Sequence, residues 1–163
     1  MVENRRHGGY TLMEVAIVIT ILSMLFGLVW LNILGSKERA SQNATIDVLL
    51  SDIRSQQLRA MLGDTGGRVG NDSYGLHFNA TSYTLFHGST YSPADPSNQT
   101  INLGDNERFQ SVLFPASQIL FASVSGQVVG FSQGNNSFVL SNVSLQTQKT
   151  VQINQLGTVY AIN

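Results

Sequence analysis

The chain has 163 residues, enough for one domain and an accessory segment, and a formal net charge of −1. It contains no cysteine, which excludes disulfide bonds, thiolate catalysis and cysteine-type zinc sites. From residue 63 onward it has three basic and five acidic side chains, so the composition does not predict a basic surface for nucleic acid.

The N-terminal region combines a short polar, basic segment with a long apolar one. Residues 1–9 read MVENRRHGG, and residues 15–34 contain no charge. At about 1.5 Å per residue, a helix over this apolar run would cross a hydrocarbon core of roughly 30 Å. A secretory signal would be cut after its apolar part, where the sequence SKER is a poor match. An uncleaved membrane anchor remains an alternative, because Arg5 and Arg6 would hold its N-terminus in the cytoplasm.

The apolar run continues into a segment with helical periodicity. Apolar residues recur at helical spacing, with polar and charged residues between them, at Ile46, Leu49, Leu50, Ile53, Leu58, Met61 and Leu62. No proline occurs before Gly63, which begins a turn-rich stretch. We therefore predict one continuous helix from about Tyr10 to Leu62, roughly 80 Å long, whose second half needs a surface to pack on.

The remainder of the chain has the period of two that is typical of strands. Strand-like segments, separated by turn sequences, occupy residues 73–78, 82–88, 108–114, 118–124, 127–132, 136–142, 149–154 and 158–163. Short strands at close spacing predict an antiparallel sheet, and the last two segments a terminal hairpin. Residues 88–99 are expected to form a long polar loop.

The junction of the two N-terminal segments resembles a known motif. Gly9-Tyr10-Thr11-Leu12-Met13-Glu14, with a basic leader before it and a charge-free run after it, resembles the prepilin signature of type IV pilins and type II secretion pseudopilins. Tyr10 and Met13 stand where that signature usually has Phe and a branched aliphatic residue.

The region after the helix is also similar, less specifically, to the GspH/FimT group of minor pseudopilins. This likeness consists of the many strands, Tyr74-Gly75-Leu76 at the start of the first one, and the closing pattern over residues 151–159. Major pilins often have a cysteine pair near the C-terminus and a proline where Leu31 stands. Neither is present, which favours a minor subunit.

The resemblance implies an α+β, pilin-like fold, in which a long N-terminal α-helix, half transmembrane and half amphipathic, packs on an antiparallel β-sheet domain. The implied parts are a leader peptide over residues 1–9, a transmembrane and filament-core helix over 10–35, an amphipathic half-helix over 36–62, and a globular β-rich domain over 63–163.

The resemblance also implies a role for three residues. Prepilin peptidase would cut between Gly9 and Tyr10 and would methylate the new amine of Tyr10. Glu14 would pair with the cationic N-terminus of its own or a neighbouring subunit during filament assembly. The alternatives are a plain flexible joint at Gly8-Gly9 and a Glu14 that is solvated at the headgroups and favoured by the helix dipole.

The implied function is that of a structural subunit in a pilus-like or type II secretion filament. Its partners would be prepilin peptidase, other pilin or pseudopilin subunits, the inner-membrane assembly platform and, before assembly, membrane lipid. The chain would start as a single-pass inner-membrane protein with a cytoplasmic N-terminus and then enter an extracytoplasmic filament. The alternatives are a pilin-like receptor, for example for DNA, and a simple membrane-tethered exported domain.

No catalytic or metal site is expected. His77 and His87 fall in adjacent predicted strands, but no carboxylate stands at ligand spacing beside them. The dense run of acids of a calcium loop is absent, and no set of Ser, His and Asp for nucleophilic catalysis is suggested. We therefore expect no enzyme activity, no cofactor and no metal.

Overall fold

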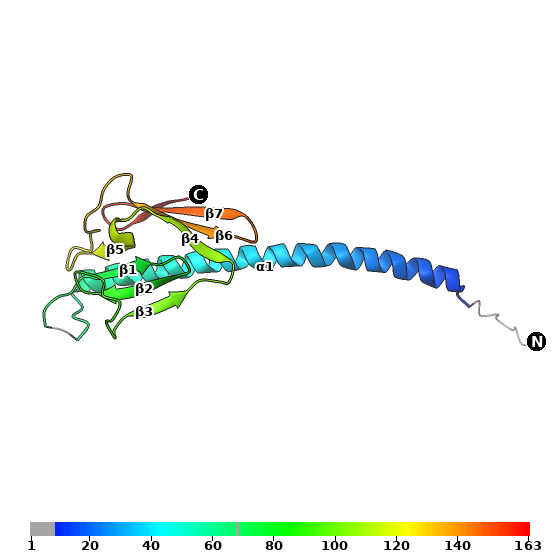
Figure 1. Ribbon diagram of the computed structural model, residues 1–163, viewed down its shortest axis with the longest axis horizontal. Helices are drawn as coiled ribbons and strands as arrows, with labels where there is room; N and C mark the ends of the chain where they lie inside the picture. The colour runs from blue at the N-terminus through cyan, green and yellow to red at the C-terminus, as the bar shows by residue number, and fades with distance from the viewer. Residues whose placement is uncertain (1–8, 68) are drawn as a thin grey trace, which may run out of the picture. The chain divides into compact units, whose positions relative to one another are not determined.

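The architecture is α+β, as predicted. A computed structural model describes residues 9–67 and 69–163, although the side chains of residues 28–37 are outside this description. One long helix, α1 (Leu12–Leu62), is followed by eight strands and a short 3-10 turn, η1 (Pro115–Ser117) (Figure 1). The strands are β1 (Tyr74–Phe78), β2 (Ser82–His87), β3 (Gln99–Asn102), β4 (Glu107–Val112), β5 (Gln118–Phe121), β6 (Ser137–Asn142), β7 (Thr147–Ile153) and β8 (Val159–Ile162).

The chain forms two compact units, Met1–Glu38 and Arg39–Asn163, whose boundary falls within α1. The first unit contributes the beginning of the helix. The second contains the rest of the helix and every strand, and it holds the hydrophobic core.

The end of α1 is set by a glycine, as the sequence predicted. Gly63 adopts a left-handed conformation with φ of 65°, which a residue with a Cβ would adopt only at a cost. Its N–H donates to the carbonyl of Ala60, and the N–H of Asp64 donates to that of Arg59. This pair of bonds is a Schellman motif, which satisfies carbonyls that the last turn would otherwise leave without partners.

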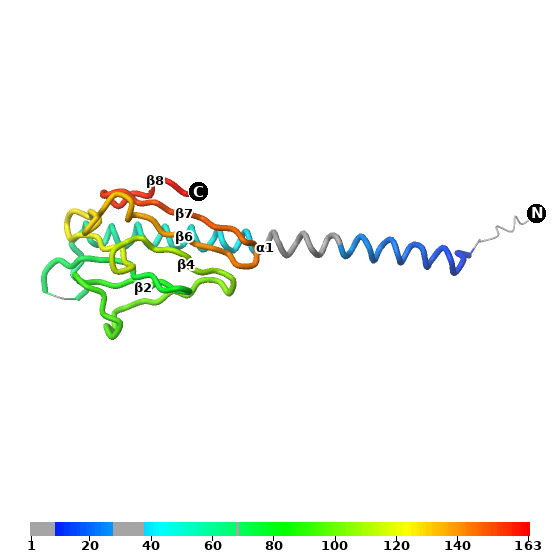
Figure 2. Tube along the Cα trace, turned by 45° about the horizontal axis from the view of Figure 1, so that its top comes forward, coloured from blue at the N-terminus to red at the C-terminus, as the bar shows by residue number. Residues whose placement is uncertain are grey.

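The strands form two antiparallel sheets of four strands each. The first has the order β3-β2-β1-β5 and the second the order β4-β6-β7-β8, whose strands are seen in Figure 2. β7 and β8 form the predicted terminal hairpin.

One expectation about the strands was wrong, and one strand was not predicted. Residues 127–132 form no strand, because turns interrupt them and only Val128 makes a bridge, to Phe121. Conversely, β3 pairs with β2 at the end of the predicted 88–99 loop.

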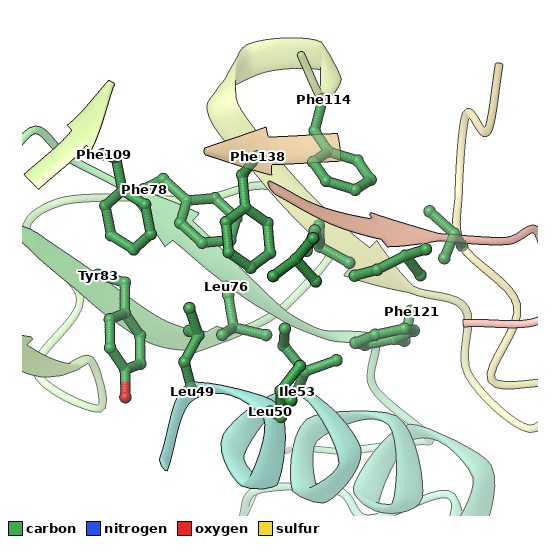
Figure 3. Packing of buried hydrophobic residues seen from close by; sticks show 14 of the residues in the cluster. Leu49, Leu50, Ile53, Leu76, Phe78, Tyr83, Phe109, Phe114, Phe121 and Phe138 are labelled. Atoms are coloured by element: carbon green, nitrogen blue, oxygen red, sulfur yellow. The ribbon is translucent and has the colours of Figure 1, made fainter. Parts of the chain in front are cut away.

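The second half of α1 packs its apolar face on the sheets (Figure 3). Leu49 and Ile53 are fully buried, and they lie beside Leu76 and the aromatic cluster of Phe78, Phe109 and Phe138. Fully burying such a side chain contributes roughly 1.5–3 kcal/mol. The contact with the sheets thus stabilises a half-helix that would be marginal alone.

Polar side chains also fix the helix to the strands and loops. The hydroxyl of Tyr83 donates to Asp52 Oδ2 over 2.6 Å, and Thr147 Oγ1 donates to Gln42 Oε1 over 2.9 Å. Near the end of the helix, Gln57 Nε2 donates to the carbonyls of Gly126 and Leu156. Burial and the bond to Asp52 raise the pKa of Tyr83, so this phenol stays protonated as a donor.

The sequence pattern predicted a longer buried face for the helix than the structure shows. Ile46 is buried as expected, but Leu58, Met61 and Leu62 are 55%, 49% and 75% exposed. Loops that bond to Gln57 adjoin the last turns, and the strands do not cover these three side chains.

Candidate functional site: the start of the long helix

The predicted cleavage site lies in exposed, non-helical backbone directly before α1. Gly9 and Tyr10 are outside the helix, and the Tyr10 side chain is 82% exposed. A Cβ placed on Gly9 would meet no atom within 4 Å. An endopeptidase needs an accessible and extensible segment, and the peptide bond between these two residues has both properties.

Thr11 starts the helix. Its side-chain oxygen accepts a hydrogen bond of 3.2 Å from the backbone N–H of Glu14, and its carbonyl accepts bonds from Glu14 and Val15. These contacts identify Thr11 as the N-cap and place Glu14 at the third helical position. The spacing Thr-x-x-Glu is that of a capping box, and we did not predict this role of Thr11 from the sequence.

Glu14 is thereby held in the first turn of the helix, where its backbone is fixed. Unpaired backbone N–H groups give this end of a helix a partial positive charge, which favours a carboxylate there. Glu14 lines a shallow groove with Tyr10, Val15, Val18 and Ile19. The site is therefore one acidic group in apolar surroundings, one turn from the exposed residue at the predicted cut.

Beyond Glu14 the helix presents mainly apolar side chains, and two of its hydroxyl side chains bond to the helix backbone. Thr20 Oγ1 donates to the carbonyl of Ala16 and Ser23 Oγ to that of Ile19, each over 2.8 Å. Both hydroxyls are thus satisfied within the helix, while the neighbouring Ile17, Val18 and Ile21 are about half exposed.

The predicted transmembrane segment is only partly within the described residues. Its members 28–35 have no described side chains. Among the described residues, no helix combines the length and the apolar composition that a membrane crossing requires.

The two strand histidines make separate contacts. His87 Nδ1 lies 2.9 Å from Asp72 Oδ2, and the ring stacks on Tyr74. His77 stacks instead on Tyr91, and burial lowers its pKa. In the part of the chain that the structure describes, no group of three or more His, Cys, Asp or Glu side chains is placed to hold a metal ion.

Comparisons with known proteins agree with the motif at this end of the chain. The family described as "Prokaryotic N-terminal methylation motif" matches residues 4–30. The chain is also similar to the type II secretion system core protein G of Aeromonas hydrophila, with 41% identity over 49 residues. That match covers 30% of this chain and 34% of the relative, and no solved structure matches the chain.

Both matches are partial, and the family model lies over the predicted motif. The chain carries the prepilin-type N-terminal methylation motif, and the comparisons support the pilin and pseudopilin family for it. Members of this family are structural subunits, so the comparisons favour a structural role over a catalytic one.

Proposed function

We propose that the protein is a minor pilin or pseudopilin, a subunit that is processed at its N-terminus and built into a pilus-like or type II secretion filament through α1. The observation that carries the proposal is the arrangement at the start of α1. An exposed Gly9–Tyr10 bond precedes a capped helix whose first turn contains the only acidic residue between residues 9 and 37.

The exposure of Gly9 and Tyr10 supports cleavage of the peptide bond between them. Residues that enter a protease active site must be extended, and Gly9 and Tyr10 precede the N-cap, Thr11. The cut would therefore leave the first turn of the helix and its cap intact. It would create a cationic amine on Tyr10, which the peptidase would then methylate.

Glu14 would receive that amine during assembly. In apolar surroundings a lone carboxylate costs roughly 2.5–3.5 kcal/mol near the centre of a bilayer, and a cationic partner reduces this cost. The amine of a neighbouring subunit would supply the partner at one position along the fibre. The pair would thus fix where each subunit enters the filament.

The proposed location follows from the two ends of the apolar segment. Arg5 and Arg6 would keep the leader in the cytoplasm, and the strand domain would lie on the far side of the inner membrane. The assembly platform and other pilin-like subunits would then extract the processed helix from lipid into the filament.

Intact mass and N-terminal sequence of protein extracted from native membranes test the proposal. The expected product starts at Tyr10 and is heavier by one methyl group than the unmodified chain. A protein that retains Met1 in the presence of active peptidase would leave a membrane-tethered domain as the better description.

A further inference from the structure

The first sheet has an outer face, opposite the hydrophobic core, on which buried side chains also gather. Side chains alternate between the two faces of a strand, and Leu76 and Phe78 of β1 belong to the core. His77 between them therefore lies on the outer face, together with its cross-strand partner Thr84 on β2. Phe86 follows two residues after Thr84, and it is only 3% exposed although it lies outside the core cluster.

Tyr91 covers part of this outer face. It belongs to residues 88–98, called the 88–98 loop here, which connect β2 to β3. The Tyr91 ring stacks on His77, with 4.1 Å between the centroids and an interplanar angle of 10°, and it meets Phe86 edge-on at 5.4 Å. Gly88, at φ of 116°, lets the chain turn back over the sheet directly after β2. Tyr91 therefore fixes the start of the 88–98 loop on the outer face.

The His77 ring has no acceptor for the proton that it would gain in acid. Its Nδ1 atom is buried and has no hydrogen-bond partner among the described residues. The groups that face the ring are Thr84 and Gln118, which lie opposite it on β2 and β5, and the phenol of Tyr91. Thr84 and Gln118 carry no charge, and a tyrosine phenol is uncharged in mild acid. Protonation would therefore create a buried charge and an N–H donor without an acceptor.

His87, the last residue of β2, is in a different position. Its Nδ1 lies 2.9 Å from Asp72 Oδ2, so a carboxylate is already present to receive a proton-bearing ring nitrogen. Burial lowers the pKa of His77, and in the described part of the chain no charged side chain contributes to this effect. His77 is therefore the histidine whose protonation conflicts with its surroundings.

We propose that protonation of His77 releases Tyr91 and lifts the 88–98 loop from the outer face of the first sheet, so that the loop is a cover that opens in mild acid. An imidazolium needs water at Nδ1. Tyr91 is the neighbour that can move without breaking a strand pair, because Thr84 and Gln118 lie in paired strands. The cover is closed above the usual histidine pKa, about 6.5, and opens as the pH falls through the lower value of the folded protein.

Opening changes the surface at two places. It uncovers the side of the Phe86 ring that Tyr91 now contacts, which adds apolar surface to the outer face. It also reshapes a shallow pocket of about 410 Å³ at the end of β2, because five of the seven residues that line the pocket belong to the loop. The other two are Gly66 and His87. The protein would thus present different surfaces in neutral and in mildly acidic surroundings.

Thiol labelling of the full-length protein in detergent tests the proposal, because the natural chain has no cysteine. Thr84→Cys places a thiol on the outer face opposite His77, where the natural side chain is 2% exposed. A disulfide reagent that reacts in acid is used at about pH 7.5 and about pH 5.5. Rates are taken relative to Gln148→Cys, an exposed position on β7. We expect the relative rate at residue 84 to rise several-fold at the lower pH.

Ser137→Cys is the control for general loosening. This position on β6 is also buried, at 8% exposure, but it belongs to the second sheet. Its relative labelling rate should not rise with that of Thr84→Cys. An equal rise would show that acid loosens the whole domain, and it would overturn the proposal.

Substitutions at the stacked pair identify the trigger and the cover. His77→Phe keeps a ring against Tyr91 but gains no proton, so Thr84→Cys should be labelled slowly at both pH values in this background. Tyr91→Ala removes the cover and should give fast labelling at both pH values, whereas Tyr91→Phe keeps the stack and should behave like the natural residue.

Three results would overturn the proposal: no rise in the natural background, the same rise with His77→Phe, or slow labelling of Tyr91→Ala at neutral pH. None of these measurements depends on cleavage after Gly9 or on filament assembly. The cover can therefore fail without affecting the proposed function, and the proposed function can fail without affecting the cover.

Discussion

At the scale of single residues, Gly75 shows how closely neighbouring strands of the first sheet surround a position without a side chain. A Cβ at this position would lie 2.5 Å from the carbonyl oxygen of Ile119 and 2.9 Å from the ring of Phe86. Gly75→Ala should therefore destabilise the protein by about 1–3 kcal/mol, the usual cost of overpacking. Urea unfolding followed by fluorescence measures this. Gly104→Ala, whose Cβ would lie 3.3 Å from the carboxyl carbon of Glu107 and has no backbone atom among its nearest neighbours, should cost clearly less.

His77 makes stability depend on pH. Burial lowers the pKa of His77, so the folded protein binds fewer protons than the unfolded chain at a pH between the two values. The stabilising effect of the neutral ring is complete above the unfolded pKa, about 6.5, and is lost as the pH falls through the folded value.

We expect Tm to fall between about pH 7.5 and about pH 5.5, and His77→Phe to reduce that fall. Phenylalanine keeps a flat ring against Tyr91 but does not titrate in this range. Thermal unfolding of both proteins at the two pH values measures the difference. An identical fall in the variant would show that His77 does not contribute.

At the scale of elements, the two faces of the second half of α1 should respond differently to truncation. Ile53 is fully buried, so Ile53→Ala should cost about 2–5 kcal/mol of folding free energy. Val48, 52% exposed on the opposite face, should change the stability of the isolated subunit by no more than about 0.5 kcal/mol when replaced by alanine. Urea denaturation of both variants at low protein concentration gives the comparison. A large effect of Val48→Ala there would place part of the core on the uncovered face.

At the scale of the whole molecule, sequence patterns predicted the positions of the helix and strands better than they predicted which side chains make contacts. The start and end of α1 were predicted within two residues, since a long periodic run ends at Gly63. β3 was missed because its residues, Gln-Thr-Ile-Asn, form an exposed edge strand with one half-buried apolar side chain. Residues 127–132 have strand-like composition, yet the turns around them allow only one bridge. Periodicity also could not show that Leu58, Met61 and Leu62 lie beyond the covering strands.

The candidate site depends on an ordered motif of adjacent residues, so the sequence alone singles out Gly9, Tyr10 and Glu14. The role of Thr11 was missed, although Thr11 and Glu14 have the capping-box spacing that could have revealed it. Which helix face remains uncovered depends on tertiary packing, so the sequence could not separate exposed apolar residues such as Val48 and Leu58 from the core.

Glu14 links the start of the helix to assembly, and its replacement should separate processing from incorporation. Glu14→Ala leaves the Gly9–Tyr10 bond exposed and the Thr11 cap intact, because the cap bonds to the backbone N–H of residue 14. The variant should be cut like the natural protein, yet its amount in sheared filaments should fall by at least about tenfold, equivalent to about 1.4 kcal/mol. Glu14→Asp retains the charge on a shorter side chain and should retain part of the incorporation. Quantitative immunoblotting of membrane and filament fractions, with intact-mass measurement of the cut, reports both steps. Normal incorporation of Glu14→Ala would show that the carboxylate is a solvated helix-end residue and that the filament is held in register by other contacts.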